Sequence, residues 1–148
     1  MRIRVKKWLL HYTVAALLFA LIDALWILTV ARQQYENHIG HLLASEPNIA
    51  AAAAFYFIYI AGIVHYGIRP NNQEISLSKR VASAALFGLF TYATWALTAL
   101  TILKGFPPII AITDILWGVC ISGFVAWLVV LLSRRLHRKQ LKPQPKNK

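Results

Sequence analysis

Four long apolar stretches constrain this chain more than any other feature of its sequence. They cover residues 8–30, 49–68, 81–103 and 108–132. A helix needs about 20 apolar residues to cross the hydrocarbon core of a bilayer. Hydrophobic residues make up 58% of the chain and charged residues only 14%, which leaves too little polar surface for a small soluble domain. The sequence therefore predicts an all-α membrane protein, a four-transmembrane-helix bundle over residues 1–132, embedded in a lipid bilayer.

The cysteine content and the lack of known motifs exclude several classes of protein. Cys120 is the only cysteine, so no internal disulfide can form and a thiol–disulfide membrane enzyme is excluded. No nucleotide-binding loop, serine-hydrolase elbow or zinc-protease motif is present, and no cofactor is predicted. The N-terminus is basic, like the start of a signal peptide. The apolar run that follows is too long for one, contains Asp23 and lacks a clear cleavage site, so we interpret it as an uncleaved first transmembrane helix.

Basic residues alternate between the predicted connections. Fourteen of the sixteen Lys and Arg residues lie in the first seven residues, in the second connection or after residue 132. The first connection contains only Arg32 and the third only Lys104. Because cytoplasmic segments carry the excess of basic residues, both termini are predicted to be cytoplasmic. We expect a multi-pass protein of the bacterial inner membrane.

The last sixteen residues, 133–148, differ in kind from the rest. They are basic, contain two prolines and have almost nothing to bury, so they predict a disordered cytoplasmic tail. The tail could contact anionic lipid headgroups, since each Lys or Arg near such a surface contributes about 1 kcal/mol. No aromatic or groove-reading element accompanies the basic residues, so no nucleic-acid partner is expected.

Polar and small residues punctuate the apolar stretches. Residues 45–48 offer capping side chains to the second stretch, Ser76 or Ser78 can cap the third, and residues 105–108 predict a short turn. Small residues at four-residue spacing predict close helix packing; they are Ala16 and Ala20 in the first stretch and Gly118, Ser122 and Ala126 in the fourth.

Two aspartates lie inside predicted membrane-spanning stretches. An aspartate at the centre of such a helix costs roughly 2.5–3.5 kcal/mol on insertion scales. Asp23 precedes the outer end of the first stretch by about seven residues, and Asp114 follows the start of the fourth by about six, which places both roughly 10 Å below the outer boundary. Each is followed three residues later by a tryptophan, Trp26 or Trp117, on the same helix face. The two carboxyl groups could face one another across the bundle.

These residues define a candidate polar pocket that opens outward. Its predicted members are Asp23, Trp26, Tyr56, Trp95, Thr98, Asp114 and Trp117. The aspartates could serve a proton-linked site or anchor a substrate headgroup. They could equally be structural, joining the first and fourth helices through hydrogen bonds. The sequence leaves both interpretations open.

The first connection, residues 31–48, mixes apolar and polar side chains. This mixture could form an amphipathic helix on the outer surface. His38 and His41 lie three residues apart with Glu36 nearby, which makes them weak candidates for a metal site.

Several short motifs in order along the chain resemble one family. They are Leu-Ile-Asp-Ala-Leu-Trp at 21–26, His-Ile-Gly-His-Leu-Leu at 38–43 with Pro47 and Asn48, Phe55-Tyr56 with Tyr59 and Gly62, Tyr-Ala-Thr at 92–94 with Leu97 and Thr98, and Asp114 with Trp117 and Gly118. Together they resemble the small bacterial membrane proteins grouped as domain of unknown function 2177. The resemblance covers residues 17–126 and implies a four-helix inner-membrane protein without supplying an activity.

The chain departs from the family pattern in the third helix. Family members often carry an acidic residue and an amide around a Leu-Thr pair, where this chain has Ala96 and Ala99. Thr98 is kept. A polar site shared between the first, third and fourth helices would have lost part of its polarity here.

The sequence is compatible with three functions. The first is binding or transport of a small ligand, such as a cation, or of a lipid headgroup in the outward-facing pocket. The second is an accessory subunit or scaffold of a membrane complex that packs through small-residue faces. The third is an intramembrane lipid-modifying enzyme with the aspartates as general acid and base. A homo-oligomer or a membrane-protein partner would suit a chain with only four helices.

Overall fold

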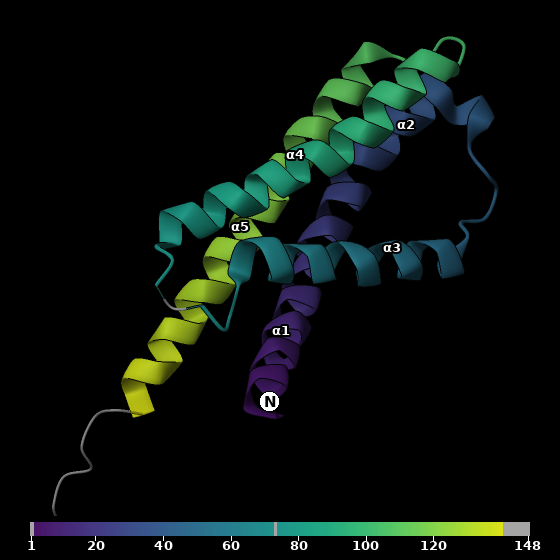
Figure 1. Cartoon of the computed structure of the whole chain (residues 1–148). Helices are drawn as coiled ribbons and strands as arrows, with labels where there is room; N and C mark the ends of the chain where they lie inside the picture. Colours follow the sequence, from purple (N-terminus) through teal and green to yellow (C-terminus); the bar gives the residue numbers. More distant parts are fainter. Residues whose placement is uncertain (1, 73, 141–148) are drawn as a thin grey trace, which may run out of the picture.

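Long helices make up the molecule (Figure 1). The computed structural model describes residues 2–72 and 74–140. The first helical segment joins α1 (Arg2–Trp26), a π-helical turn η1 (Ile27–Ala31) and α2 (Arg32–Ile39), and ends in the 3-10 turn η2 (Gly40–Leu42). The second joins α3 (Ile49–Gly62) to the π-helical η3 (Ile63–Ile68). The last two are α4 (Leu77–Ile102) and α5 (Pro108–Gln140). In the view of Figure 1, α4 and α5 run side by side, and α3 crosses in front of α1.

Four of these helical segments are long and apolar enough to cross a membrane. Large aliphatic and aromatic side chains on their outer faces are exposed, among them Ile58 at 75% and Leu17 at 69%. Such a surface is unfavourable in water and suits contact with lipid tails. The predicted all-α, four-helix membrane fold is confirmed.

Three of the predicted helix boundaries follow from local chemistry. The Asn48 side chain accepts a hydrogen bond from the Ala51 amide at 3.0 Å and caps α3. Ser76, one of two predicted candidates, caps α4 through the Lys79 amide at 3.4 Å. Gly105 takes a positive φ of 77° in the turn before α5, which a residue without a Cβ adopts at little cost.

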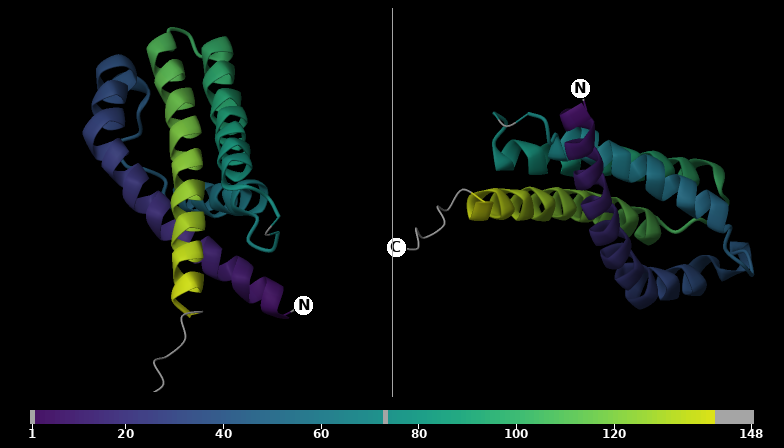
Figure 2. Two further views of the ribbon diagram at one scale, coloured as in Figure 1. Left: turned by 90° about the vertical axis from the view of Figure 1, so that its left-hand side faces the viewer. Right: turned by 90° about the horizontal axis from the view of Figure 1, so that it is seen from below.

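The first connection differs from the prediction. Residues 31–39 continue the first helix and do not form a separate helix on the surface. No proline or glycine interrupts the chain before Gly40, and Ile39 and Tyr35 pack against Phe106 and Ile110. The first helical segment bends on the way to α2, as the left view of Figure 2 shows. A π-helical turn such as η1 is a recognised cause of such bends.

The closest helix contact joins α4 and α5. A Cβ built on Gly88 would lie 2.1 Å from the Gly118 carbonyl oxygen and 2.4 Å from Ser122 Oγ. Gly118, Ser122 and Ala126 are buried, as their spacing predicts. In the first helix the prediction is confirmed only in part: Ala16 is half-buried and packs against the core, whereas Ala20 is exposed. The buried apolar positions of α1 are Ala15 and Phe19.

The two ends of the bundle carry different connections. The start of α1, the 69–76 connection and the end of α5 gather at one end, towards the bottom and left of Figure 1. There Asn71 Nδ2 donates to the Arg4 carbonyl at 3.2 Å, and Ser133 Oγ lies 2.8 Å from His11 Nε2. The short connections 43–48 and 103–107 lie at the other end. The fold therefore brings the strongly basic segments together at one end.

The last helix extends further than the sequence predicts. Residues 133–140, expected to be disordered, continue α5 to Gln140. Arg, Lys, Leu and Gln are good helix formers, and nothing before Pro143 forces the helix to stop. Residues 141–148 of the predicted tail lie outside the described residues.

Candidate functional site

A cavity of about 600 Å³ lies between α1, α2, α4 and α5 near the end with the short connections. Asp23 from α1 and Asp114 from α5 both line it, and both side chains are buried, at 5% and 8% exposure. The two carboxyl groups therefore share one cavity. Of the other residues named in the candidate pocket, Trp26, Trp95 and Trp117 also line it.

Asp23 is held by two strong donors. Tyr56 Oη donates to Asp23 Oδ2 at 2.7 Å, and Trp117 Nε1 donates to Asp23 Oδ1 at 2.8 Å. These bonds come from α3 and α5, so one carboxyl group joins three helices. Both oxygens of Asp23 already have a partner, which limits what else this group can bind.

Asp114 has one partner and one open oxygen. Tyr35 Oη, from α2, donates to Asp114 Oδ2. No hydrogen bond from a described residue reaches Oδ1. Every fully buried polar side-chain atom in the described part of the chain has a hydrogen-bond partner, so Oδ1 is not among the fully buried atoms. Oδ1 therefore keeps accessible surface, and Asp114 lines the cavity. This oxygen is available to a ligand.

One turn of α5 connects the two aspartates. Trp117 lies three residues after Asp114, so both side chains point to the same face of the helix. Trp117 also stacks on Trp26, with ring centroids 4.4 Å apart and planes within 6°. The Trp26–Trp117 stack and the bond from Trp117 to Asp23 fix the position of α5 against α1.

Aromatic side chains form most of the remaining wall. Tyr35, Phe55, Tyr92 and Trp95 line the cavity together with the Trp26–Trp117 stack. Phe55 and Trp95 also keep 43% and 54% of their surface exposed. The aromatic wall is thus partly on the outside of the bundle, where lipid would lie.

Polar contacts from α2 border the cavity. Arg32 lines it, and its Nε donates to Glu36 Oε1 at 2.7 Å. Thr113 Oγ1 donates to Gln34 Oε1 at 3.0 Å, which joins α2 to α5 next to Asp114. The continuation of the first helix past η1 is what brings these residues to the site.

Two predicted pocket residues are placed differently. Tyr56 does not line the cavity, but its hydroxyl group donates a hydrogen bond to Asp23. Thr98 is exposed and lies outside it; Thr91, two turns earlier on α4, lines the cavity. The hydroxyl groups of Thr91, Thr94 and Thr101 donate to carbonyl groups of their own helix.

Sequence reasoning missed Tyr35, Arg32 and Tyr92. Tyr35 and Arg32 belong to a segment expected to be a connection, and Tyr92 was named only as part of a family motif. The one available signal was that no proline or glycine occurs between Val30 and Gly40, which allows the helix to continue.

The weak metal candidates lie on the surface. His38 and His41 are exposed, and His38 Nδ1 donates to the Gln34 carbonyl at 2.8 Å. Glu36 pairs with Arg32. Among the described residues, no three His, Cys, Asp or Glu side chains gather closely enough to hold a metal ion.

Comparison with known proteins gives one match. The family model described as a predicted membrane protein, DUF2177, matches residues 8–131 of the 148. No curated protein and no solved structure matches the chain.

Proposed function

Because the chain belongs to the DUF2177 family of predicted membrane proteins, whose description names no activity, we propose its function from the cavity itself. The protein binds a small cationic ligand, or the cationic end of a lipid headgroup, between α1, α2, α4 and α5. Binding of this kind is the first step of transport or of sequestration within the membrane.

The open oxygen of Asp114 carries this proposal. A carboxylate in a largely aromatic cavity is costly unless a donor or cation reaches it. Tyr35 supplies only one bond to Asp114, and Arg32, which also lines the cavity, is paired with Glu36. A cationic group on Oδ1 would complete the coordination of Asp114. Asp23 stabilises the helices around the cavity through its own two bonds.

The aromatic wall supports a cation over a neutral ligand. Cations bind over the faces of Trp and Tyr rings, which contributes about 2 kcal/mol or more when the cation is desolvated. Trp26, Trp95 and Tyr92 supply such rings around Asp114. The cavity volume of about 600 Å³ is within the range of small-molecule sites.

The basic segments support an orientation for the cavity. If the end that carries Arg4, Arg69 and Arg134 faces the cytoplasm, as the positive-inside rule predicts, the cavity lies in the outer half of the bacterial inner membrane. The exposed faces of Phe55 and Trp95 then offer a lateral path from the outer leaflet. A ligand could enter from the lipid or from the outer surface.

The test measures cation binding to the purified protein in neutral detergent. Three of the five tryptophans line the cavity, so titration with tetramethylammonium and with ethanolamine should change the tryptophan fluorescence. Asp114→Asn should weaken binding of the better probe at least tenfold, since the charge on the open oxygen is lost. Thr98→Ala is the matched control and should bind as the wild type does.

Two outcomes would contradict the proposal. One is that neither cation binds at millimolar concentration. The other is that a folded Asp114→Asn variant binds as tightly as the wild type. Asp23→Asn separates the two aspartates: it removes an acceptor from Tyr56 or Trp117, so it should lower the unfolding temperature more than Asp114→Asn does.

A further inference from the structure

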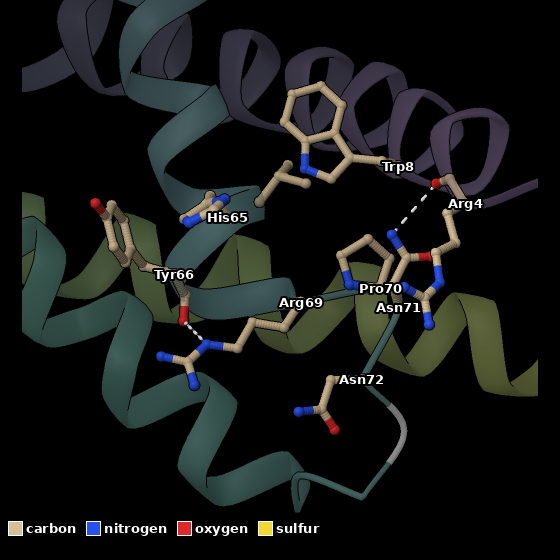
Figure 3. Close-up of a pocket in the computed structure, with 9 residues that line it drawn as sticks. Arg4, Trp8, His65, Tyr66, Arg69, Pro70, Asn71 and Asn72 are labelled. Carbon is tan, nitrogen blue, oxygen red and sulfur yellow. Dashed lines mark hydrogen bonds between the residues drawn. The ribbon is translucent and has the colours of Figure 1, made fainter. Parts of the chain in front are cut away.

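A second cavity lies where the start of α1 meets η3 and the turn that follows it, and Figure 3 shows the residues that line it. It measures about 520 Å³. Arg4 and Trp8 reach it from α1, His65 and Tyr66 from η3, and residues 69–72 from the turn that follows. It shares no residue with the cavity that contains the aspartates.

The charge of this cavity is entirely positive. Two arginines line it and no acidic residue does. Within the described residues, the ion pair between Arg32 and Glu36 is the only one, so neither Arg4 nor Arg69 is neutralised by a carboxylate there. Arg69 Nε donates to the Tyr66 carbonyl at 2.6 Å, which anchors the side chain and leaves its two terminal nitrogens for another acceptor.

The turn that presents Arg69 has an unusual backbone. Arg69 has a φ of 45°, the only positive φ at a non-glycine position in the described part of the chain. A residue with a Cβ rarely adopts this conformation, and such positions persist only where the surrounding structure holds them. The conformation ends η3 and turns the chain into Pro70.

A buried arginine, Arg80, stabilises this turn through hydrogen bonds to its carbonyl groups. Arg80 is 5% exposed, and its guanidinium donates to the carbonyl groups of Ile68, Arg69 and Asn72. Its Nε donates to the Ile75 carbonyl at 3.1 Å. With its nitrogens occupied by these carbonyl groups, Arg80 fixes the turn and adds a third positive charge beside the cavity. The Arg69 conformation is therefore built into the fold.

Amide and aromatic groups complete the cavity. Asn71 Nδ2 ties the turn to the Arg4 carbonyl at 3.2 Å, and Asn72 Oδ1 accepts from the Glu74 amide at 3.2 Å. The side-chain nitrogen Nδ2 of Asn72 has no hydrogen-bond partner among the described residues and remains a donor. Trp8 stacks on Tyr12 with centroids 5.3 Å apart. Tryptophan and tyrosine collect at the headgroup level of membranes, which supports a position of this cavity near the lipid phosphates.

From this arrangement we propose that the second cavity binds a phosphate group, carried by an anionic phospholipid headgroup or by free phosphate. Arg69 binds its oxygens through its two terminal nitrogens, since a guanidinium can donate two parallel bonds to one phosphate. Arg4 adds positive charge from the other side of Pro70 and Asn71 (Figure 3). Asn72 offers a further donor. Trp8 and Tyr66 pack against the glycerol region when the phosphate belongs to a lipid.

The test uses the full chain purified in neutral detergent, with two probes. Native mass spectrometry counts the phosphatidylglycerol molecules retained per chain, with phosphatidylcholine as the comparison lipid, and the same titration with inorganic phosphate tests the free ion. We expect one tightly retained phosphatidylglycerol and a wild-type preference over phosphatidylcholine of at least tenfold. Competition by inorganic phosphate at low millimolar concentration would identify free phosphate as the ligand, and no competition would identify the lipid.

Variants decide whether this cavity is the site. Arg4→Gln should weaken retention at least fivefold, and it leaves the Arg4 carbonyl bond to Asn71 in place, so the fold is preserved. Arg4→Gln combined with Arg69→Gln should abolish it. Lys79→Gln removes one charge from an exposed position at the same end and should change retention less than twofold. Two results would overturn the proposal. One is that Arg4→Gln and Lys79→Gln retain phosphatidylglycerol equally well. The other is that the wild type neither prefers phosphatidylglycerol over phosphatidylcholine nor binds inorganic phosphate.

Discussion

The contact between α4 and α5 makes the sharpest prediction about stability, because one methyl group tests it. Gly88→Ala would place a Cβ 2.1 Å from the Gly118 carbonyl oxygen, about 1.3 Å closer than an ordinary contact of 3.4 Å. Two helix backbones must separate to remove this overlap. Ser122 Oγ cannot move freely either, because it donates to the Gly118 carbonyl at 2.6 Å and accepts from Tyr59 Oη at 2.7 Å.

Two opposing contributions determine how much Gly88→Ala lowers the free energy of unfolding. Overpacking of a well-packed interior costs about 1–3 kcal/mol, and the rigid backbone partner places this site at the upper end. Alanine in place of glycine within a helix returns about 0.5–1 kcal/mol. We therefore expect Gly88→Ala to lower the free energy of unfolding by about 2 kcal/mol.

Gly123→Ala is the matched control. A Cβ on Gly123 would meet Ala85 Cβ at 3.5 Å and Val81 Cγ1 at 3.6 Å, which are ordinary contacts. This variant should therefore keep the helix gain and be as stable as the wild type or up to about 1 kcal/mol more stable. Unfolding by SDS in mixed micelles, followed by tryptophan fluorescence, measures both. A Gly88→Ala protein as stable as Gly123→Ala would refute the close contact between α4 and α5.

Three further predictions use the same unfolding assay or a topology reporter. Tyr56→Phe removes one donor to Asp23 and should lower the free energy of unfolding by about 1 kcal/mol. The control Tyr12→Phe removes an exposed bond to the Phe57 carbonyl and should lower it by less than about 0.5 kcal/mol. Equal losses would contradict the role of Asp23 in joining the helices. Arg80→Gln should cost about 2 kcal/mol because several turn carbonyls lose their donor, and a loss no larger than that of Lys79→Gln would refute this. A reporter fused after Lys148 should be cytoplasmic and one inserted at 43–48 should be outside; the reverse result would invert the orientation proposed for both cavities.

The two cavities suggest different roles for the ends of the bundle. The aspartate cavity is aromatic and carries two aspartates and one arginine, Arg32, which is paired with Glu36, whereas the second cavity carries arginines and amides but no acidic residue. The two proposals accordingly differ in the charge of the ligand, a cation at the aspartate cavity and a phosphate at the second cavity. Each proposal has its own probe and its own variant, so failure of one leaves the other to be judged separately.

The sequence by itself determined the class of fold and the number of helices. The thickness of a bilayer requires helices of a certain length, and the apolar stretches have that length, so the second stretch was predicted from 49 to 68 as the structure has it. Capping chemistry is equally local, which is why Ser76 could be identified as a cap candidate. The two aspartates were recognisable as a pair because their depth depends only on counting residues along two helices.

Only the tertiary structure decided how these helices face one another. In a soluble protein, alternation of polar and apolar residues marks the buried face, but here lipid-facing Leu17 and buried Phe19 are both apolar, so their sequence pattern does not distinguish them. The rotation of each helix about its axis therefore stays undetermined until the helices pack. That rotation sets Tyr35 on Asp114, places Thr91 instead of Thr98 at the cavity, and leaves one carboxylate oxygen open.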